Sequence, residues 1–264
     1  MKYPDTLKIE ITNYCDGNCV YCSNHLNKPK GYMDIKMFKA IIDDFPEVKK
    51  ITPQWFGESS LHPDFYEALR YAKKKGKSIR FYTNGASIDP YKLAKIGVNE
   101  VRFSIEADNK ELYEKLRRGL NWDVVYKNIM EFQKLKGATK VLVRMTVTEE
   151  NRDRIHEIKA FWKKRVRNVT MYNEHSVCRE VEGHYKKVTS CKKPSELMII
   201  GWNGDYVMCC TDYNRKITLG NVKDGARKVW EDGAKMREQV EKGKMLGICK
   251  ECGFTHTAYL TKVK

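Results

Sequence analysis

Residues 7–22 read LKIEITNYCDGNCVYC, and this stretch decides what fold and chemistry the chain of 264 residues can support. An apolar, strand-like run leads directly into a loop with three cysteines, Cys15, Cys19 and Cys22, at the spacing C-x3-C-x2-C. A [4Fe–4S] cluster normally takes four cysteine ligands. A loop that supplies three thiolates leaves one iron open to another ligand, which is the arrangement that a catalytic cluster needs.

Zinc and disulfides are the two other interpretations of these cysteines. Zinc knuckles usually combine a C-x2-C pair with a second, distant pair, so a tight triplet fits zinc poorly. The sequence shows neither an apolar signal segment nor an apolar run of about 20 residues, so we expect a cytoplasmic protein without a membrane span. Because the cytoplasm keeps thiols reduced, the nine cysteines indicate metal rather than disulfides.

The composition is strongly basic, with 50 Lys and Arg against 34 Asp and Glu and a formal net charge of +16. A charge of this sign suits nucleic acid, an anionic substrate or an acidic protein partner. A lysine-rich surface of the thermophile kind, with no partner, explains the same numbers. The sequence contains neither a P-loop nor a G-x-G-x-x-G fingerprint, so it does not indicate nucleotide binding of those kinds.

The first two thirds of the chain alternate strand-like and helix-like segments. Strands are expected at residues 7–12, 50–56, 79–83, 101–105, 141–147 and 169–172. Helices are expected at residues 33–45, 63–75, 90–96, 110–136 and 152–164. Apolar strands separated by helices imply parallel pairing through βαβ crossovers. Six such units are too few for an eight-fold barrel, so we expect an α/β fold of the partial (β/α)6 TIM barrel type.

The pattern changes near residue 173. The rest of the chain has few periodic segments but contains six of the nine cysteines. We therefore expect two domains, the partial barrel at residues 1–176 and a small cysteine-rich domain at residues 177–264.

The cysteine loop and its surroundings resemble the radical S-adenosylmethionine superfamily. The aromatic Tyr21 before the last cysteine, in a loop that follows a first strand, is part of that pattern. The resemblance implies that Cys15, Cys19 and Cys22 hold a [4Fe–4S] cluster whose open iron binds S-adenosyl-L-methionine. It also implies cleavage of this cofactor to a 5′-deoxyadenosyl radical, which abstracts a hydrogen atom from the substrate. The cofactors then perform the difficult chemistry, and the protein orients them.

The same resemblance implies cofactor contacts at the ends of the second and third strands. Gly57 and Glu58 resemble the family's Gly-Gly-Glu motif, which holds the methionine amino group, although Phe56 replaces its first glycine. The alternative role for Glu58 is to cap the next helix. Thr83 and Asn84 begin a Thr-Asn-Gly turn like that of many relatives, and a plain turn explains them equally well.

The fourth strand and the segment after it supply the remaining expected cofactor contacts. Ser104 and Glu106 stand where relatives carry a Ser-x-Asp or similar contact to the ribose. Arg117 and Arg118 are expected in the following helix, where an arginine of the family often pairs with the S-adenosylmethionine carboxylate. The sequence does not distinguish between the two arginines, and a solvated helix face explains either. These positions follow carboxyl ends of strands, the face on which barrel active sites are built.

The C-terminal cysteines form a second group. Cys191 and Cys209 belong to a C-x12-G-x4-C pattern, and Cys249 and Cys252 form a later C-x2-C pair. This group resembles the shorter, Twitch form of the SPASM domains found in the same superfamily. The resemblance implies one auxiliary [4Fe–4S] cluster that all four cysteines hold and that relays electrons, and zinc is the alternative metal.

Two more cysteines lie near this group. Cys210 is the alternative to Cys209, which we prefer because it completes the G-x4-C spacing. Successive residues of an extended segment point in opposite directions, so we expect only one of the two to be the ligand. Cys178 is expected to be an ordinary buried cysteine.

Within the superfamily, a single fully ligated auxiliary cluster is similar to that of the butirosin-pathway deoxy-scyllo-inosamine dehydrogenase. The similarity implies a redox-coupled, dehydrogenase-like reaction in which the auxiliary cluster accepts the second electron. The candidate catalytic residues are Glu174 and His175, after the sixth strand, and Arg144, on the fifth. Because one frame serves many reactions, the cluster pattern does not identify the substrate.

The expected partners are a small-molecule or peptide substrate and an acidic electron donor such as flavodoxin or ferredoxin. The chain begins directly at the first barrel strand, which counts against a function in binding leader peptides without excluding protein substrates. The positive charge suggests two alternatives, radical modification of RNA and a non-catalytic zinc or iron–sulfur protein that binds nucleic acid. The sequence shows no RRM aromatic pair and no KH G-x-x-G motif, so nucleic acid is the less favoured partner.

Overall fold

The computed structural model describes residues 2–173 and 189–251, and these residues form two compact units. Unit 1 contains residues 2–14, 23–79 and 189–251, and unit 2 contains the remaining described residues, 15–22 and 80–173. Both units are assembled from separate stretches of the chain. The domain boundary that the sequence suggests, between residues 176 and 177, stays a prediction.

Four parallel strands form the sheet of unit 2. The last four residues of β4 (Ser78–Thr83) pair with β5 (Glu100–Ser104), which pairs with β7 (Lys140–Val147). The outer neighbour of β7 is β8 (Asn168–Asn173). Neighbouring strands are consecutive in the chain and are joined by helices, so the parallel βαβ pattern and the α/β class predicted from the sequence are confirmed.

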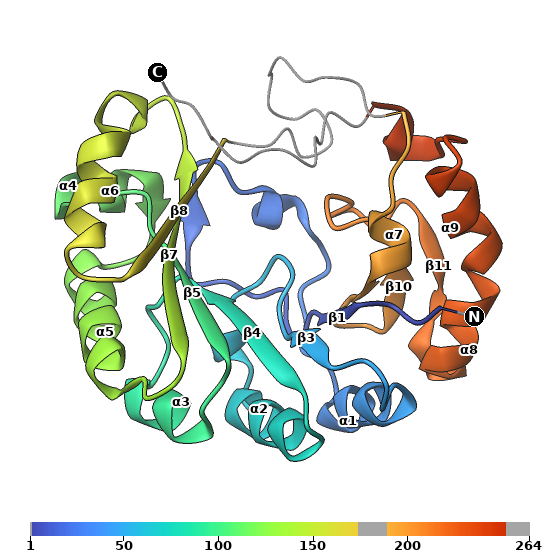
Figure 1. Ribbon diagram of the computed structural model, residues 1–264. Coiled ribbons are helices and arrows are strands. Elements are labelled where there is room, and N and C mark those ends of the chain that lie inside the picture. Colours follow the sequence, from blue (N-terminus) through green and yellow to red (C-terminus); the bar gives the residue numbers. More distant parts are fainter. Residues whose placement is uncertain (1, 174–188, 252–264) are drawn as a thin grey trace. The chain divides into compact units, whose positions relative to one another are not determined.

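Helices lie along one side of these strands (Figure 1). They are α3 (Pro90–Ile96), α4 (Lys110–Leu116), α5 (Trp122–Leu135) and α6 (Ile155–Lys163), which follows the 3-10 turn η3 (Arg152–Arg154). Three of these helices have an N-cap residue whose side chain accepts a hydrogen bond from a backbone N–H of the first turn. These residues are Asp89 for α3, Asn109 for α4 and Asn121 for α5. These caps therefore fix where α3, α4 and α5 begin.

The sheet of unit 1 is centred on β1 (Thr6–Ile9). It pairs in parallel with β3 (Lys50–Thr52) on one side and with β9 (Leu197–Ile200) on the other. The first two residues of β4 pair with β3. Two antiparallel strands continue from β9, β10 (Asp205–Val207) and β11 (Thr218–Asn221). Residues from the C-terminal part of the chain thus extend the sheet beyond β1.

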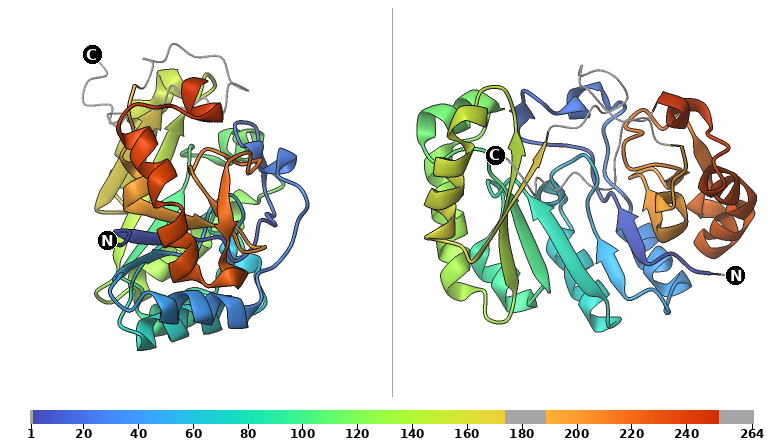
Figure 2. Two further views of the ribbon diagram at one scale, coloured as in Figure 1. Left: turned by 90° about the vertical axis from the view of Figure 1, so that its right-hand side faces the viewer. Right: turned by 45° about the horizontal axis from the view of Figure 1, so that its top comes forward.

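The helices of unit 1 are α1 (Ile35–Asp44), α2 (Phe65–Lys74), α7 (Lys193–Glu196), α8 (Ala226–Asp232) and α9 (Ala234–Glu241). Its 3-10 turns are η1 (Ser23–Leu26), η2 (Ser59–Leu61), η4 (Val222–Asp224) and η5 (Gly247–Glu251). Helix α8 packs beside β11 (Figure 2). The buried Arg237 of α9 lies 3.6 Å from the ring centroid of Trp230 and donates a 2.6 Å hydrogen bond to its carbonyl. This contact joins α8 and α9.

One sequence prediction is wrong, the placement of Arg117 and Arg118 in a helix. Helix α4 ends at Leu116, and Arg117 and Arg118 form the short strand β6 (Arg117–Arg118). This strand pairs in antiparallel fashion with β2 (Asn18–Cys19), inside the cysteine loop. The helix is interrupted because Gly119 adopts a φ of +87°, a left-handed conformation that glycine tolerates.

Candidate functional site

The cysteine loop is held by contacts within unit 2 at two places. Strand β2 pairs Cys19 with Arg117, and the N–H of Val20 donates a 3.0 Å hydrogen bond to the carbonyl of Leu116. Earlier in the loop, the Asp16 carboxylate accepts hydrogen bonds from the Asn84 amide at 2.5 Å and from the Ser87 hydroxyl at 2.7 Å. The loop that carries the three thiols is therefore tied down by backbone pairing and by a carboxylate clamp.

This arrangement gives Asn84 a defined place. Its side-chain oxygen accepts the N–H of Ala86 at 2.8 Å while its amide holds Asp16, and the Thr83 hydroxyl accepts the N–H of Gly85 at 2.9 Å. Gly85 itself has a φ of +86°. The Thr-Asn-Gly turn thus both closes β4 and supports the cysteine loop. A cofactor contact of Thr83 and Asn84 stays a prediction.

Behind the loop, Glu106 and Arg117 form a buried ion pair. The Arg117 Nη2 donates to one Glu106 carboxylate oxygen at 3.0 Å, and Nε donates to the other. The remaining terminal nitrogen, Nη1, donates to the Cys19 sulfur at 3.6 Å. Burial raises the pKa of the Cys19 thiol, and the Arg117 guanidinium opposes that rise.

Ser104 and Arg118 lie nearby in the sequence but are placed differently. Ser104 is the last residue of β5 and is half-buried, whereas Arg118 is exposed on β6. The guanidinium of Arg117 lies 5.7 Å from the ring centroid of Tyr21. Cofactor binding by Tyr21, Ser104, Glu106 and either arginine stays a prediction.

The Gly57–Glu58 turn belongs to unit 1, where it packs on the backbone that leads into the cysteine loop. A Cβ added to Gly57 would lie 2.2 Å from the Thr12 carbonyl oxygen, so only glycine permits this approach. The N–H of Glu58 donates a 2.8 Å hydrogen bond to the carbonyl of Tyr14. The buried Glu58 side chain accepts from the N–H and hydroxyl of Ser60, and it caps η2. Glu58 therefore caps the 3-10 turn η2, whereas Asp64 is the N-cap of helix α2. A role of Gly57 and Glu58 toward the methionine amino group stays a prediction.

Contacts within unit 1 anchor the segments that carry the C-terminal cysteines. The N–H of Cys191 donates to the carbonyl of Val240, close to the end of α9. Met208, beside Cys209, donates its N–H to the Ile217 carbonyl at 3.0 Å. A Cβ on Gly247, two residues before Cys249, would lie 2.9 Å from the Ile217 side chain. Cys252 lies outside the described residues, as does Cys178.

The side chains of Cys209 and Cys210 lie within hydrogen-bonding reach of each other. The Sγ of Cys209 lies 3.2 Å from the Thr211 hydroxyl. Cys210 packs against the apolar cluster of Trp55, Ile199 and Val207, and its carbonyl accepts the Trp55 indole N–H at 2.7 Å. The choice between Cys209 and Cys210 as the metal ligand stays a prediction.

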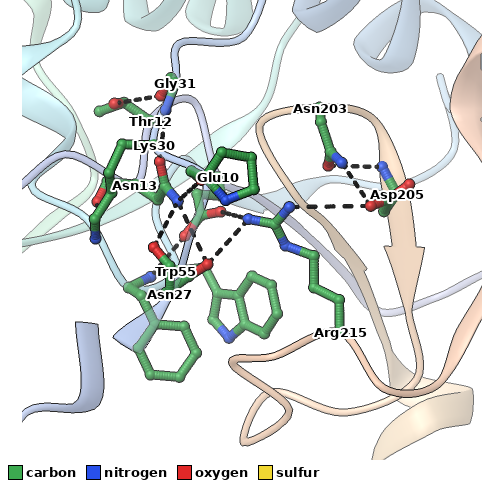
Figure 3. A network of polar contacts seen from close by, with 12 residues as sticks. Glu10, Thr12, Asn13, Asn27, Lys30, Gly31, Trp55, Asn203, Asp205 and Arg215 are labelled. Atoms are coloured by element: carbon green, nitrogen blue, oxygen red, sulfur yellow. Dashed lines mark hydrogen bonds and ion pairs between the residues drawn. The ribbon is translucent and has the colours of Figure 1, made fainter. Parts of the chain in front are cut away.

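A buried polar network in unit 1 escaped the sequence analysis (Figure 3). Glu10 follows β1 and is fully buried, with one carboxylate oxygen accepting the Phe56 N–H at 3.0 Å and the other 3.9 Å from Arg215 Nη2. Lys30 donates to the carbonyls of Asn13, at 3.0 Å, and Asn24, at 2.6 Å. Burial raises the pKa of Glu10 to about 7, against the lowering by the Phe56 N–H and Arg215.

Arg144 lies on β7 within the sheet of unit 2. Its guanidinium is 4.1 Å from the ring centroid of Tyr172 and 5.6 Å from that of Tyr82. A guanidinium stays protonated in proteins, so Arg144 suits binding or orienting a substrate better than accepting a proton. Glu174 and His175 lie outside the described residues. Catalytic roles for all three stay predictions.

The donor set at the N-terminal loop fits an iron–sulfur cluster. Its three half-buried thiols can each bind a different iron of a cluster, because the fold presents them on one short, anchored loop. Among residues 2–173 and 189–251, no three His, Cys, Asp or Glu side chains converge as they would around one metal ion. In the same residues, no helix has both the length and the apolar character that a bilayer crossing requires.

Two families of known proteins match the sequence. The family described as the radical SAM superfamily matches residues 9–161, more than half of the chain. The SPASM family, described as an iron-sulfur cluster-binding domain, matches residues 191–253.

Two curated relatives differ in how much of their length is matched. The tungsten-containing aldehyde ferredoxin oxidoreductase cofactor-modifying protein of Pyrococcus furiosus is 32% identical over 171 residues, which cover 60% of this chain and 47% of that protein. The S-adenosyl-L-methionine-dependent 2-deoxy-scyllo-inosamine dehydrogenase of Niallia circulans is 21% identical over 262 residues, 93% of this chain and 91% of that protein. The chain thus spans less than half of the first relative and nearly all of the second.

Solved structures share the fold. BtrN in complex with AdoMet and 2-DOIA has a TM-score of 0.67 at 17% identity and covers 98% of both chains. Streptococcus suis SuiB bound to the precursor peptide SuiA has a TM-score of 0.71 at 16% identity, covering 87% of this chain and 65% of that one.

Proposed function

Because this chain belongs to the radical S-adenosylmethionine superfamily, we propose that it catalyses a redox-coupled, dehydrogenase-like oxidation of a small-molecule alcohol. The two matching families imply a [4Fe–4S] cluster, an auxiliary cluster and S-adenosyl-L-methionine, as the sequence predicts. The dehydrogenase reaction rests on one observation: the relative matched over 91% of its length is named as a dehydrogenase.

In this proposal, Cys15, Cys19 and Cys22 hold the first cluster. The auxiliary cluster takes its ligands from the C-terminal group Cys191, Cys209, Cys249 and Cys252. When bound, the first cluster and S-adenosylmethionine would supply a 5′-deoxyadenosyl radical for removal of a substrate hydrogen atom, and the auxiliary cluster would supply an acceptor for the remaining electron.

The residues of this chain would bind, orient and deprotonate the substrate. Arg144, fixed between two tyrosine rings, would bind an oxygen of the substrate through its N–H groups. Glu174 or His175 would accept the hydroxyl proton. The net charge of +16 supports docking of an acidic electron donor such as flavodoxin or ferredoxin, and a cytoplasmic location suits both the donor and the reduced thiols.

The first experiment tests the enzyme class. Protein purified and reconstituted without oxygen should contain about eight irons and should release 5′-deoxyadenosine from S-adenosylmethionine when dithionite is added. The control is the triple variant Cys15→Ala, Cys19→Ala, Cys22→Ala. It should keep only the iron of the auxiliary cluster and should release no 5′-deoxyadenosine. Protein that contains zinc alone would refute the proposal.

The second experiment tests the reaction. 2-Deoxy-scyllo-inosamine and a panel of related cyclitols, labelled with deuterium at each carbinol carbon, are supplied as probes. Oxidation to a ketone with transfer of deuterium into 5′-deoxyadenosine would support the dehydrogenase reaction. Transfer of deuterium without a ketone product would exclude it and favour a rearrangement.

Peptide modification is the second candidate function. The fold is shared with SuiB, whose structure contains a precursor peptide. Oxidised peptide products with no cyclitol turnover would replace the first candidate by the second.

A further inference from the structure

The ion pair behind the cysteine loop has a geometry that assigns a task to Arg117. This residue is buried, with 5% of its surface exposed, although it directly precedes the exposed Arg118 on β6. Antiparallel pairing sets Arg117 opposite Cys19. The backbone register therefore places Arg117 and Cys19 on the same face of this strand pair.

Glu106 fixes the direction of the guanidinium. Arg117 uses Nε and Nη2 for the two carboxylate oxygens, and one of these oxygens also accepts the N–H of Thr146 at 3.3 Å. The Glu106 carbonyl accepts the Asn151 amide at 3.1 Å. Because Nε and Nη2 both donate to Glu106, the third guanidinium nitrogen, Nη1, points at the Cys19 sulfur, 3.6 Å away.

We propose that Arg117 is a positioning residue that donates a hydrogen bond to the Cys19 sulfur, with Glu106 holding the guanidinium in place. This inference rests on the proposed cluster at the N-terminal loop. It assigns Arg117 to a cluster ligand, in place of the S-adenosylmethionine carboxylate that the family resemblance suggests.

The consequence is an effect on the reduction potential. A hydrogen bond to a ligand sulfur draws negative charge away from a cluster and stabilises its reduced form. The Glu106 carboxylate limits this effect, because it neutralises the guanidinium from the opposite side. Removing the arginine should therefore lower the potential, and removing only the carboxylate charge should raise it.

The test uses anaerobically reconstituted protein and electron paramagnetic resonance (EPR) during a redox titration without S-adenosylmethionine. The signal of the N-terminal cluster is identified as the one that changes when S-adenosylmethionine is added afterwards. Arg117→Gln should lower the equilibrium constant for reduction of that cluster several-fold, because the hydrogen bond and the positive charge of the guanidinium both stabilise the reduced cluster more than the oxidised one. Glu106→Gln, which keeps the side-chain shape, should raise it.

Lys115→Gln is the matched control, because it removes an exposed positive charge two residues earlier in the chain. It should leave the potential unchanged. Equal potentials in Arg117→Gln and the wild type, or shifts of the same sign in Arg117→Gln and Glu106→Gln, would overturn the proposal. So would an unchanged potential combined with weaker S-adenosylmethionine binding, since that result assigns Arg117 to the cofactor carboxylate.

Two further outcomes are decisive. If Arg117→Gln does not retain the cluster, the reduction potential of Glu106→Gln decides alone. A potential in Glu106→Gln that is not higher than that of the wild type then refutes the proposal. If wild-type protein contains no N-terminal cluster, the proposed function fails first, and the inference fails with it. Iron analysis of the wild type separates these failures.

Discussion

Replacing Glu10 by Gln tests the buried polar network of unit 1. The carboxyl group is fully buried, and burial raises its pKa from an ordinary value of 4.5 to about 7. The folded protein therefore keeps a proton that the unfolded chain releases near pH 4.5. Between these two values the folded state binds more protons, so stability falls as the pH rises.

The magnitude follows from the two pKa values. A pKa change of one corresponds to 1.36 kcal/mol. Between pH 5 and pH 8, the wild type should thus lose about 2.5 kcal/mol of unfolding free energy at this site. Glutamine cannot titrate, so the Glu10→Gln variant should become more stable relative to the wild type by about that amount over the same range.

The assay is urea unfolding without oxygen, followed by tryptophan fluorescence at pH 5, 6, 7 and 8. Loss of the clusters on unfolding affects both proteins alike and cancels in their difference. Glu149→Gln, at an exposed position, is the control, and its unfolding free energy should change with pH as that of the wild type does. If the unfolding free energy of Glu10→Gln also changed with pH as that of the wild type does, Glu10 would be a carboxylate stabilised by Arg215. The reasoning from burial would then be wrong.

Three further predictions concern the loops around the thiols. Cys209→Ala should lose the auxiliary iron, whereas Cys210→Ala should keep it, and iron analysis of both variants distinguishes the two ligands. Asp16→Ala removes two hydrogen bonds from the cysteine loop and should speed the loss of N-terminal iron to a chelator several-fold, which absorbance at the cluster band follows. Gly57→Ala should destabilise the protein by about 3 kcal/mol in urea unfolding, because its Cβ meets a backbone oxygen at 2.2 Å; wild-type stability would contradict this packing.

The sequence predicted the parallel strands well because each is a short apolar run that a helix-like segment separates from the next. It predicted the second strand too long, at residues 50–56, whereas β3 ends at Thr52. The chain turns there because Phe56 donates its N–H to Glu10 and Gly57 packs against residues 12–14. Those partners lie about 45 residues away in the sequence, so no local pattern reports them.

The C-terminal strands were missed for a related reason. β9, β10 and β11 contain three or four residues each, and β9 forms only by adding to the edge of β1. Arg117 and Arg118 were assigned to a helix because the segment is charged and helix-compatible on both sides. The glycine at 119 was the one available signal for a break.

Glu10 illustrates a functional signal that a sequence does contain. A carboxylate directly after β1 is unexpected, because β1 has strand neighbours on both sides and such parallel strands lie in apolar surroundings. Such a residue predicts a buried partner. Its identity, Arg215, could not be predicted, because that partner comes from the far C-terminal part of the chain.

The two ends of the cysteine loop depend on different kinds of contact. The residues before it, 12–14, are held in unit 1 by the backbone of Gly57 and Glu58. This contact is possible because residue 57 is a glycine, which has no side chain. The loop itself is held in unit 2 by β6 and by the Asp16 carboxylate. Protein contacts therefore order the loop, and cluster binding need not supply the free energy for folding it, unlike metal binding in a zinc finger. Substitutions at Asp16 should consequently affect cluster retention far more than the folding of the surrounding sheet.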